Sequence, residues 1–140
     1  MTISIINGPN LNLLGKREPA VYGAVSFDEF LVALRERFSN ISITYYQSNV
    51  EGELINEIQR AGFACDGIIL NPGGYTHTSV AIGDAVAAIK APVIEVHISN
   101  VHAREAFRQH SYVSPKAAGT ICGLGLEGYA LALQWLTRTA

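Results

Sequence analysis

Apolar and polar positions follow two different periods along the chain. Short runs rich in β-branched residues predict five strands, at residues 3–6, 41–46, 67–70, 92–96 and 120–122. Apolar residues at helical spacing predict a helix with one apolar stripe, formed by Phe27, Phe30, Leu31, Leu34 and Phe38. Similar patterns predict further helices around Leu54, around Ala85 and from Tyr129 to Leu136.

Strands that alternate with helices are typical of a parallel sheet with helices on both faces. Five strands in 140 residues fit a flavodoxin-like, doubly wound α/β domain. No repeat or linker interrupts the pattern, so residues 1–140 are expected to form a single catalytic domain. Residues 7–25 form a long connection without periodicity, and such loops are usually functional, often as lids.

Two helix starts carry the pattern of a capping box, in which a serine precedes a glutamate by three residues. These pairs are Ser26 with Glu29 and Ser48 with Glu51. We therefore predict that both serines cap the helices that follow them.

A glycine motif, GLGLEG at residues 123–128, follows the last strand. A dinucleotide fingerprint also needs a following strand and an acidic residue about 20 positions further on. The sequence ends 12 residues after Gly128. We interpret the motif as a tight turn with close packing between strand and helix.

Composition indicates self-association. The chain has 49% hydrophobic and 16% charged residues, whereas soluble domains average about 25% charged residues. So little charge leaves much apolar surface, which subunit contacts can bury. We expect a homo-oligomer; a monomer with a weakly charged surface is the alternative.

Charge and cysteine content exclude several classes of protein. The net charge is −2, and no run of Lys and Arg offers the basic face that nucleic-acid binding needs. No apolar segment reaches the ~20 residues of a membrane span, and the first residues do not resemble a signal peptide. Cys65 and Cys122 are expected to be buried, reduced thiols of a cytoplasmic protein.

Polar residues gather where three predicted strands end. They stand in the segments NGPN after the first strand, NPGGYTHTS after the third and HISN at the end of the fourth. Ligands of doubly wound domains bind outside the carboxyl ends of the strands. Amides, hydroxyls and imidazoles at this edge favour a small ligand with several hydroxyl groups.

Glu95 and His97 are two residues apart in a predicted strand, so they share a face of the sheet. A carboxylate beside an imidazole fixes its tautomer and favours the charged form, which makes a general acid. The alternative is a structural pair buried at a strand end. The histidines show no metal-binding spacing, so we predict no metal site.

The segment KREPAVYG places a cation near a phenol. A tyrosine is a poor base at neutral pH unless a cation stabilises its phenolate, and Arg17 is close enough in sequence to Tyr22 to do so. A solvated loop without a catalytic role is the alternative. Arg104 and Arg108 could bind an anion or simply solvate a face.

Five segments together resemble the type II dehydroquinase family, in its order and spacing. They are NGPNLNLLGKREPAVYG, QSNVEGELI, ILNPGGYTHTSVA, EVHISNVHAREAFRQHSY and GLGLEGYALAL, and they cover most of the chain. The resemblance implies a 3-dehydroquinate dehydratase of the shikimate pathway, which leads to chorismate and the aromatic amino acids. It also implies an anti elimination without metal, cofactor or Schiff base, by a dodecamer built from trimers.

The resemblance assigns catalytic roles to five residues. It implies that Tyr22 takes the proton next to the ketone and that Arg17 holds Tyr22 as a phenolate. Asn10 positions a water against the enolate oxygen. His97 protonates the departing hydroxyl, and Glu95 orients His97.

The resemblance also assigns residues that bind 3-dehydroquinate through its ring hydroxyls and its carboxylate. They are Asn71, His77, Ile98, Ser99 and Arg108, together with Asp84 from a neighbouring subunit. The chain departs from the family at residue 83, where Gly stands in place of the usual Arg. This puts the charges around Asp84 and the subunit contact in question.

A second class of function is a flavodoxin-like module that binds a nucleotide or a phosphorylated metabolite. The segment THTS at residues 76–79 would then be the phosphate loop. A receiver-type signalling domain needs acidic residues at the strand ends, where this chain has asparagines.

Overall fold

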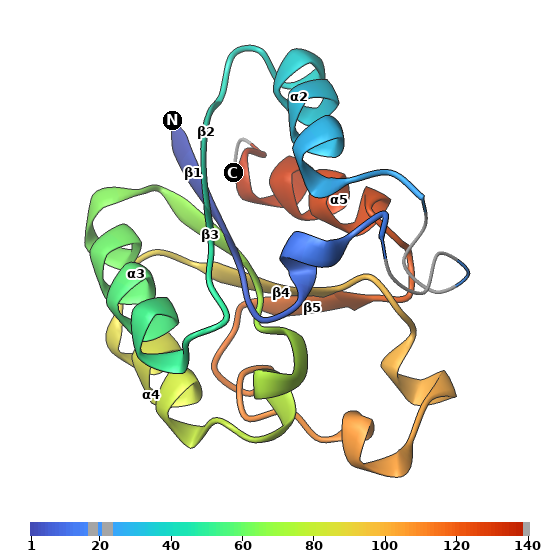
Figure 1. Cartoon of the computed structure of the whole chain (residues 1–140). Helices are drawn as coiled ribbons and strands as arrows, with labels where there is room; N and C mark the ends of the chain where they lie inside the picture. Colours follow the sequence, from blue (N-terminus) through green and yellow to red (C-terminus); the bar gives the residue numbers. More distant parts are fainter. Residues whose placement is uncertain (17–19, 21–23, 139–140) are drawn as a thin grey trace.

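A parallel five-stranded sheet forms the centre of the computed structural model, which describes residues 1–16, 20 and 24–138 (Figure 1). The strands are β1 (Thr2–Asn7), β2 (Ser42–Gln47), β3 (Gly67–Asn71), β4 (Val93–His97) and β5 (Gly119–Cys122). Their order in the sheet is β2-β1-β3-β4-β5, the order of flavodoxin-like domains. The prediction of a doubly wound α/β fold is confirmed, and each strand lies within two residues of its predicted bounds.

Helices cover both faces of the sheet (Figure 1). They are α2 (Phe27–Arg37), α3 (Glu51–Ala64), α4 (Val80–Ala88) and α5 (Glu127–Leu136). The core under α2 and α5 includes Ile5, Leu34 and Leu133, whereas Ile6 and Leu54 belong to the core under α3 and α4. Neighbouring residues of a strand point to opposite faces, which explains why Ile5 and Ile6 serve different cores.

In the part of the chain that the structure describes, four short 3₁₀ helices lie in the connections. They are η1 (Leu11–Leu13), η2 (Gly73–His77), η3 (Val101–Ala103) and η4 (Ala106–Gln109). The helices η1, η2 and η3 are the first elements after β1, β3 and β4, at the edge where these parallel strands end, and η4 follows η3. Among the described residues, no helix is long and apolar enough to cross a bilayer.

One predicted helix cap is confirmed and one is wrong. Ser26 Oγ accepts a hydrogen bond from the backbone N–H of Glu29 at 3.2 Å and caps α2. Ser48 does not cap α3, whose N-cap residue is Val50. The backbone N–H of Ser48 donates to the carbonyl of Asn7 at 3.1 Å. This bond ties Ser48 to the end of the sheet, and its hydroxyl contacts Val50 N–H and the Glu53 carboxylate instead.

The glycine motif forms the tight turn predicted for it. Gly123 and Gly125 have φ angles of 85° and 61°, a left-handed conformation that favours glycine. Their N–H groups donate to the carbonyls of His97 and Ile98 at 3.2 and 3.1 Å. A Cβ added at Gly128 would lie 3.3 Å from Val96 Cγ1, so α5 packs closely on β4.

The two cysteines are unpaired, as predicted, but they are only half-buried. The prediction that both thiols are buried is therefore wrong. Cys65 is the C-cap residue of α3, and Cys122 is the last residue of β5 at the edge of the sheet. Both therefore lie at the end of a helix or strand, where fewer side chains cover them.

Gly83 lies where α4 approaches the backbone of the segment that precedes β5. A Cβ added at this position would stand 2.4 Å from the carbonyl oxygen of Tyr112. Real side chains do not come so close, so only glycine fits without a shift of α4 or of Tyr112. The packing of α4 in this chain thus requires the glycine that departs from the family.

We predict that Gly83→Ala destabilises the protein despite the higher helix propensity of Ala. Overpacking costs about 1–3 kcal/mol, against a gain of at most ~1 kcal/mol from propensity. Gly52→Ala is the matched control, because Gly52 lies in α3 with no atom near its added Cβ. Urea unfolding at one protein concentration should show a loss for Gly83→Ala and none for Gly52→Ala. Equal stabilities of the two variants would contradict this account.

Candidate active site

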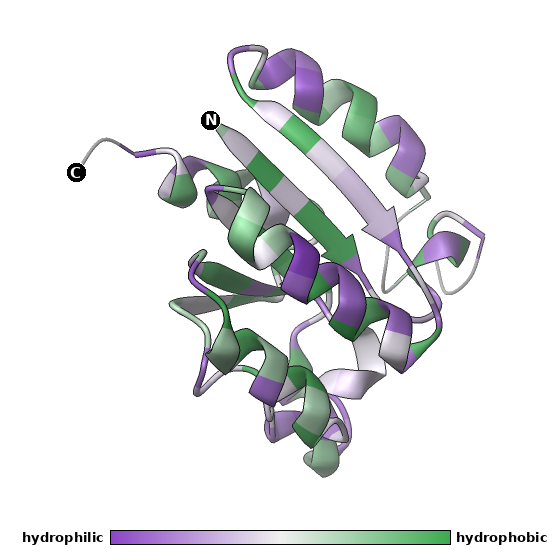
Figure 2. Cartoon of the chain, turned by 90° about the vertical axis from the view of Figure 1, so that its left-hand side faces the viewer, coloured by the Kyte–Doolittle hydropathy of each residue, from purple (hydrophilic) through white to green (hydrophobic). Residues whose placement is uncertain are grey.

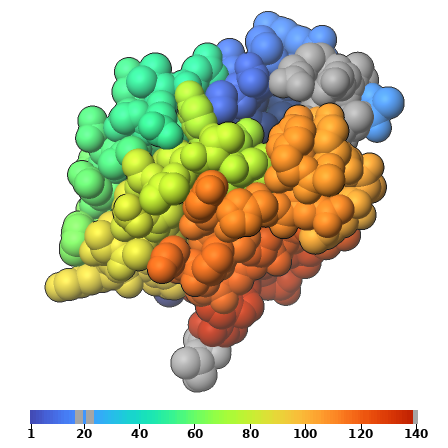
Figure 3. All heavy atoms as spheres, turned by 90° about the horizontal axis from the view of Figure 1, so that it is seen from below, coloured from blue at the N-terminus to red at the C-terminus, as the bar shows by residue number. Residues whose placement is uncertain are grey.

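A pocket lies where β1, β3 and β4 end, in the connections that follow these strands. Its volume of about 160 Å³ suits a small metabolite. In Figure 3, the segment of residues 99–118 (orange) lies against the yellow-green segment that follows β3. Tyr112 N–H joins the two segments by donating to the carbonyl of Thr76 at 2.9 Å.

The pocket brings together most of the predicted site residues. Those that line it are Asn10, Asn71, His77, His97, Ile98, Ser99 and Arg108. Glu95 stands behind His97 and is fully buried. Arg17 and Tyr22 lie outside the described residues.

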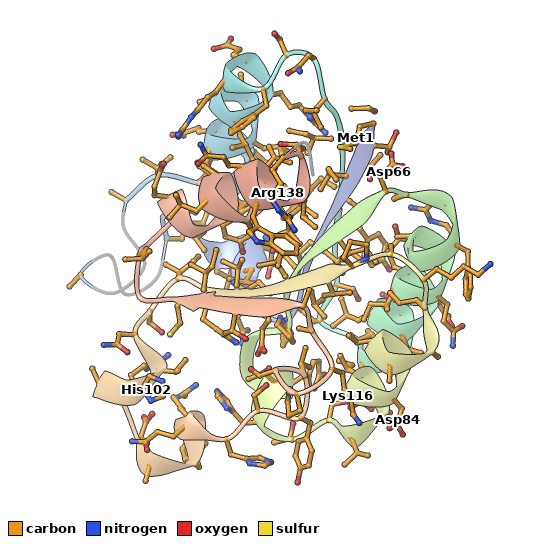
Figure 4. All side chains as sticks on the ribbon, turned by 180° about the vertical axis from the view of Figure 1, so that it is seen from behind. Met1, Asp66, Asp84, His102, Lys116 and Arg138 are labelled. Carbon is orange, nitrogen blue, oxygen red and sulfur yellow. The ribbon has the colours of Figure 1, made fainter. Side chains whose placement is uncertain are left out.

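Asp84 does not reach the pocket of its own chain. It is an exposed residue of α4 and is not among the residues that line the pocket. Figure 4 shows Asp84 at the periphery of the molecule, far from His102. This position is compatible with the expectation that Asp84 serves a neighbouring subunit.

Glu95 and His97 form the buried pair that their spacing predicted. His97 Nε2 lies 2.7 Å from Glu95 Oε1, and the two side chains are 9% and 0% exposed. Burial raises the pKa of the Glu95 carboxyl, but hydrogen bonds from His97, Ser114 and Thr76 outweigh burial and lower this pKa to about 2. Glu95 is thus a carboxylate at neutral pH and orients the imidazole beside it.

His77 faces the pocket as a neutral imidazole. Its Nδ1 lies 2.7 Å from the carbonyl oxygen of His110, which can only accept, so Nδ1 carries the proton. Burial is the main cause that lowers the pKa of His77; the hydrogen bond to the His110 carbonyl opposes this shift, and the neighbouring His97 and Arg108 add to it. Nε2 is then an acceptor, suited to a hydroxyl group of a ligand.

Asn71 is held by a buried tyrosine that the sequence pattern did not reveal. Asn71 Nδ2 donates to the hydroxyl of Tyr129 at 2.8 Å, and this hydroxyl donates to Asn7 Oδ1 at 2.8 Å. Asn71 Oδ1 accepts from Gly73 N–H at 3.1 Å. Burial raises the pKa of Tyr129 far above its usual range, so Tyr129 orients Asn71 and is no candidate base.

Asn10 has a φ of 70°, which is rare for a residue other than glycine. Its backbone N–H donates to Asn49 Oδ1 at 3.0 Å, so the end of β2 supports this conformation. Strained backbone of this kind is common at ligand-binding sites. Here the left-handed turn at Asn10 lies in the segment after β1 that lines the pocket.

Two arginines bring positive charge to the pocket. Arg104 and Arg108 both line it, which favours anion binding over the alternative of a solvated face. Arg104 Nη1 donates to Ser99 Oγ at 3.3 Å, and Arg108 Nε pairs with Glu105. The short helices η3 and η4, rather than one continuous helix, carry this segment.

The described residues place no three His, Cys, Asp or Glu side chains close enough to hold a metal ion. The polar groups of the pocket are instead imidazoles, amides, a hydroxyl and guanidinium groups. This set can bind hydroxyl and carboxylate groups and can move a proton.

Fold and pocket together define a flavodoxin-like α/β domain with a small polar pocket beside a carboxylate–imidazole pair. The family model described as dehydroquinase class II matches residues 1–137. The chain belongs to this family.

Relatives and solved structures agree with this assignment. A protein named 3-dehydroquinate dehydratase from Mycobacterium tuberculosis is 55% identical over 99% of this chain and 95% of its own length. One of the same name from Roseiflexus castenholzii is 52% identical over 99% and 90%. The type II dehydroquinase from Butyrivibrio crossotus superposes with a TM-score of 0.94, at 47% identity, covering 99% of this chain and 98% of that one.

We predict that Glu95 makes stability pH-dependent in acid. Its pKa in the folded protein is about 2, below the ordinary value of 4.5. The stabilisation is therefore present above pH 4.5 and is lost as the pH falls toward 2. Relative to Glu95→Gln, the parent should lose roughly 2–4 kcal/mol of unfolding free energy over this window. Urea titrations at several pH values check this; parallel curves for both proteins would refute it.

Proposed function

We propose that the chain catalyses the reaction of its family, the anti elimination of water from 3-dehydroquinate to give 3-dehydroshikimate. The main support is the buried Glu95–His97 pair at the wall of a small polar pocket, in a chain of the dehydroquinase class II family. This makes the protein a hydro-lyase of the shikimate pathway.

The reaction needs a base and an acid on opposite faces of the ring. The proton next to the ketone is weakly acidic, so the enolate must be stabilised as it forms. Tyr22 is the proposed base, Arg17 keeps it as a phenolate, and Asn10 positions a water near the enolate oxygen. His97 then gives a proton to the departing hydroxyl, which leaves as water.

The other pocket residues are proposed to bind the substrate. The carboxylate meets the backbone at Ile98, the hydroxyl of Ser99 and the guanidinium of Arg108. Asn71 and His77 hold ring hydroxyls, and Nε2 of the neutral His77 accepts a hydrogen bond from one of them. The reaction is redox-neutral and needs only proton transfer, so we propose that it uses no cofactor.

We also propose that the protein acts as a homo-oligomer in the cytoplasm, as a dodecamer built from trimers. The exposed side of α4 is apolar apart from Asp84, and Figure 2 shows this helix green along most of its length, unlike α3. Exposed apolar faces of this kind favour subunit contacts. Such a contact at α4 would carry Asp84 toward a neighbouring pocket.

The alternative, a nucleotide-binding module, is not favoured. Its phosphate loop would need the hydroxyls of residues 76–79. Thr76 Oγ1 donates to Glu95, and Ser79 Oγ accepts from Ile82 N–H at 3.0 Å as the cap of α4. Both side chains are buried, so of the three hydroxyls in this segment only that of Thr78 is exposed.

The direct test is to add the purified protein to 3-dehydroquinate and follow the conjugated enone of the product in the ultraviolet. We expect turnover that borohydride and chelators leave unchanged. His97→Ala should lose about 100-fold or more in kcat, the usual contribution of a general acid. Tyr22→Phe should abolish turnover with nearly unchanged substrate binding, because the phenol acts in the transition state.

The possible contradictions are separate. Absence of enone formation by the folded parent would refute the proposed activity. More than a few per cent of residual turnover in Tyr22→Phe would place the base elsewhere. Full activity of His97→Ala would leave the hydrolyase assignment intact but remove His97 as the acid.

We predict that each active site is built from two chains. Tyr22→Phe and Asp84→Ala oligomers should each be severely impaired. Unfolded and refolded together, they should regain activity, because some sites then combine wild-type Tyr22 from one chain with wild-type Asp84 from its neighbour. Each variant refolded alone is the control. If mixed oligomers of confirmed size show no recovery, Asp84 serves its own chain or only the fold.

A further inference from the structure

Three hydroxyl groups surround the carboxylate of Glu95. Thr76 Oγ1 donates to Oε1, and Ser114 Oγ donates to Oε2. Ser111 Oγ lies 3.0 Å from Oε1 and 3.3 Å from Oε2. With His97 at 2.7 Å from Oε1, four donors meet one buried carboxylate.

The hydrogen bonds around Ser111 determine that its hydroxyl donates. Ser111 Oγ accepts the backbone N–H groups of Val113 at 3.0 Å and Ser114 at 2.9 Å. These two bonds use both lone pairs of the hydroxyl oxygen. Its single proton must therefore be donated, and the acceptors in reach are Glu95 Oε1 and Thr76 Oγ1, each at 3.0 Å. Because Thr76 gives its own proton to Glu95, either choice leaves the carboxylate an acceptor.

Ser114 is arranged in the same way. Its Oγ accepts from the hydroxyl of Thr120 at 3.2 Å, so the proton of Ser114 is left for Glu95 Oε2. Both oxygens of Glu95 thus accept hydrogen bonds. A proton on either oxygen of Glu95 would be repelled by the hydrogen of a neighbouring donor. The proton between Glu95 and His97 accordingly belongs to His97 Nε2.

This arrangement decides which atom of His97 acts in the pocket. Because Nε2 is committed to Glu95, Nδ1 is the ring nitrogen that remains for a ligand. An imidazolium with Nε2 held in this way can release only its Nδ1 proton. The three hydroxyls themselves do not line the pocket, so they can influence the reaction only through Glu95 and His97.

We propose that Thr76, Ser111 and Ser114 are positioning residues for the acid step: their hydroxyls keep Glu95 a fixed, purely accepting carboxylate, so that His97 presents its Nδ1 proton to the leaving hydroxyl. The inference rests on the proposed role of His97 as the acid. Other ionisable groups near the pair are His77 on η2 and Arg108 on η4.

The test compares single variants that each remove one hydroxyl. Thr76→Val keeps the shape of the side chain, and Ser114→Ala removes one hydroxyl that accepts no backbone N–H. Each should lower kcat about tenfold, as for one hydrogen bond to a charged group, with KM unchanged. Thr76→Ser keeps the hydroxyl and should restore the parent kcat.

A buried serine nearby provides the matched control. Ser79 is 2% exposed and caps α4, but its hydroxyl makes no contact with Glu95. Ser79→Ala should lower the melting temperature as much as Ser114→Ala while kcat stays at the parent value. If Ser79→Ala lowers kcat as much as Ser114→Ala does, the effect of the hydroxyls around Glu95 is purely structural.

A spectroscopic readout reports on Glu95 itself. In protein labelled with carbon-13 at the glutamate carboxyls, the Glu95 signal is assigned by its loss in Glu95→Gln. We expect this signal to titrate at a higher pH in Thr76→Val and Ser114→Ala than in the parent. Burial raises the pKa of Glu95, and each variant removes one hydrogen bond that lowers this pKa. An unshifted titration, or a raised KM with unchanged kcat, would overturn the proposal. Full activity of His97→Ala would instead refute the acid role on which it rests.

Discussion

The buried carboxylate of Glu95 is the interaction on which the active-site half of the molecule depends. An isolated buried charge is strongly unfavourable, and only donors can offset the loss of water. Glu95 obtains donors from β4 itself, from η2 and from residues 111–114. Satisfying this one carboxylate therefore holds two connections, far apart in sequence, against the end of β4.

The same carboxylate links the fold to the pocket. The connections that it holds carry two residues that line the pocket, His77 from η2 and Arg108 from η4. His77 in turn reaches back to the carbonyl of His110 at 2.7 Å. The hydrogen bonds that stabilise the buried carboxylate of Glu95 thus also help to position the residues that line the pocket.

The sequence predicted the sheet well because β1, β3 and β4 carry buried apolar runs and β2 and β5 are rich in β-branched or aromatic residues. It also predicted that Glu95 and His97 meet, since residues two apart in a strand share a face. Ser48 was assigned wrongly as a cap, because its bond to the carbonyl of Asn7 depends on how β1 and the end of β2 lie together. Local patterns contain no such information.

Long-range contacts explain what the sequence could not predict. Tyr129 meets Asn71 across 58 residues and Asn7 across 122, and Thr76 and Ser111 meet Glu95 across 19 and 16 residues. The need for glycine at residue 83 arises from one carbonyl oxygen, that of Tyr112. The role of Asp84 rests on the family resemblance alone, because Asp84 lies outside its own chain's pocket. Those of Arg17 and Tyr22 rest on the resemblance and on their closeness in sequence, because both lie outside the described residues.

A general acid must hold its proton until the transition state and then release it. A buried carboxylate with few donors would attract the proton of its imidazole partner strongly and could take it over. Hydroxyl donors spread the negative charge of Glu95 and weaken this attraction, while the geometry still fixes Nε2. The Nε2 proton then stays on His97, and Nδ1 is the ring atom left to give a proton to the leaving group. The hydroxyls that make burial of Glu95 possible are thus suited to keep the proton of His97 available for transfer.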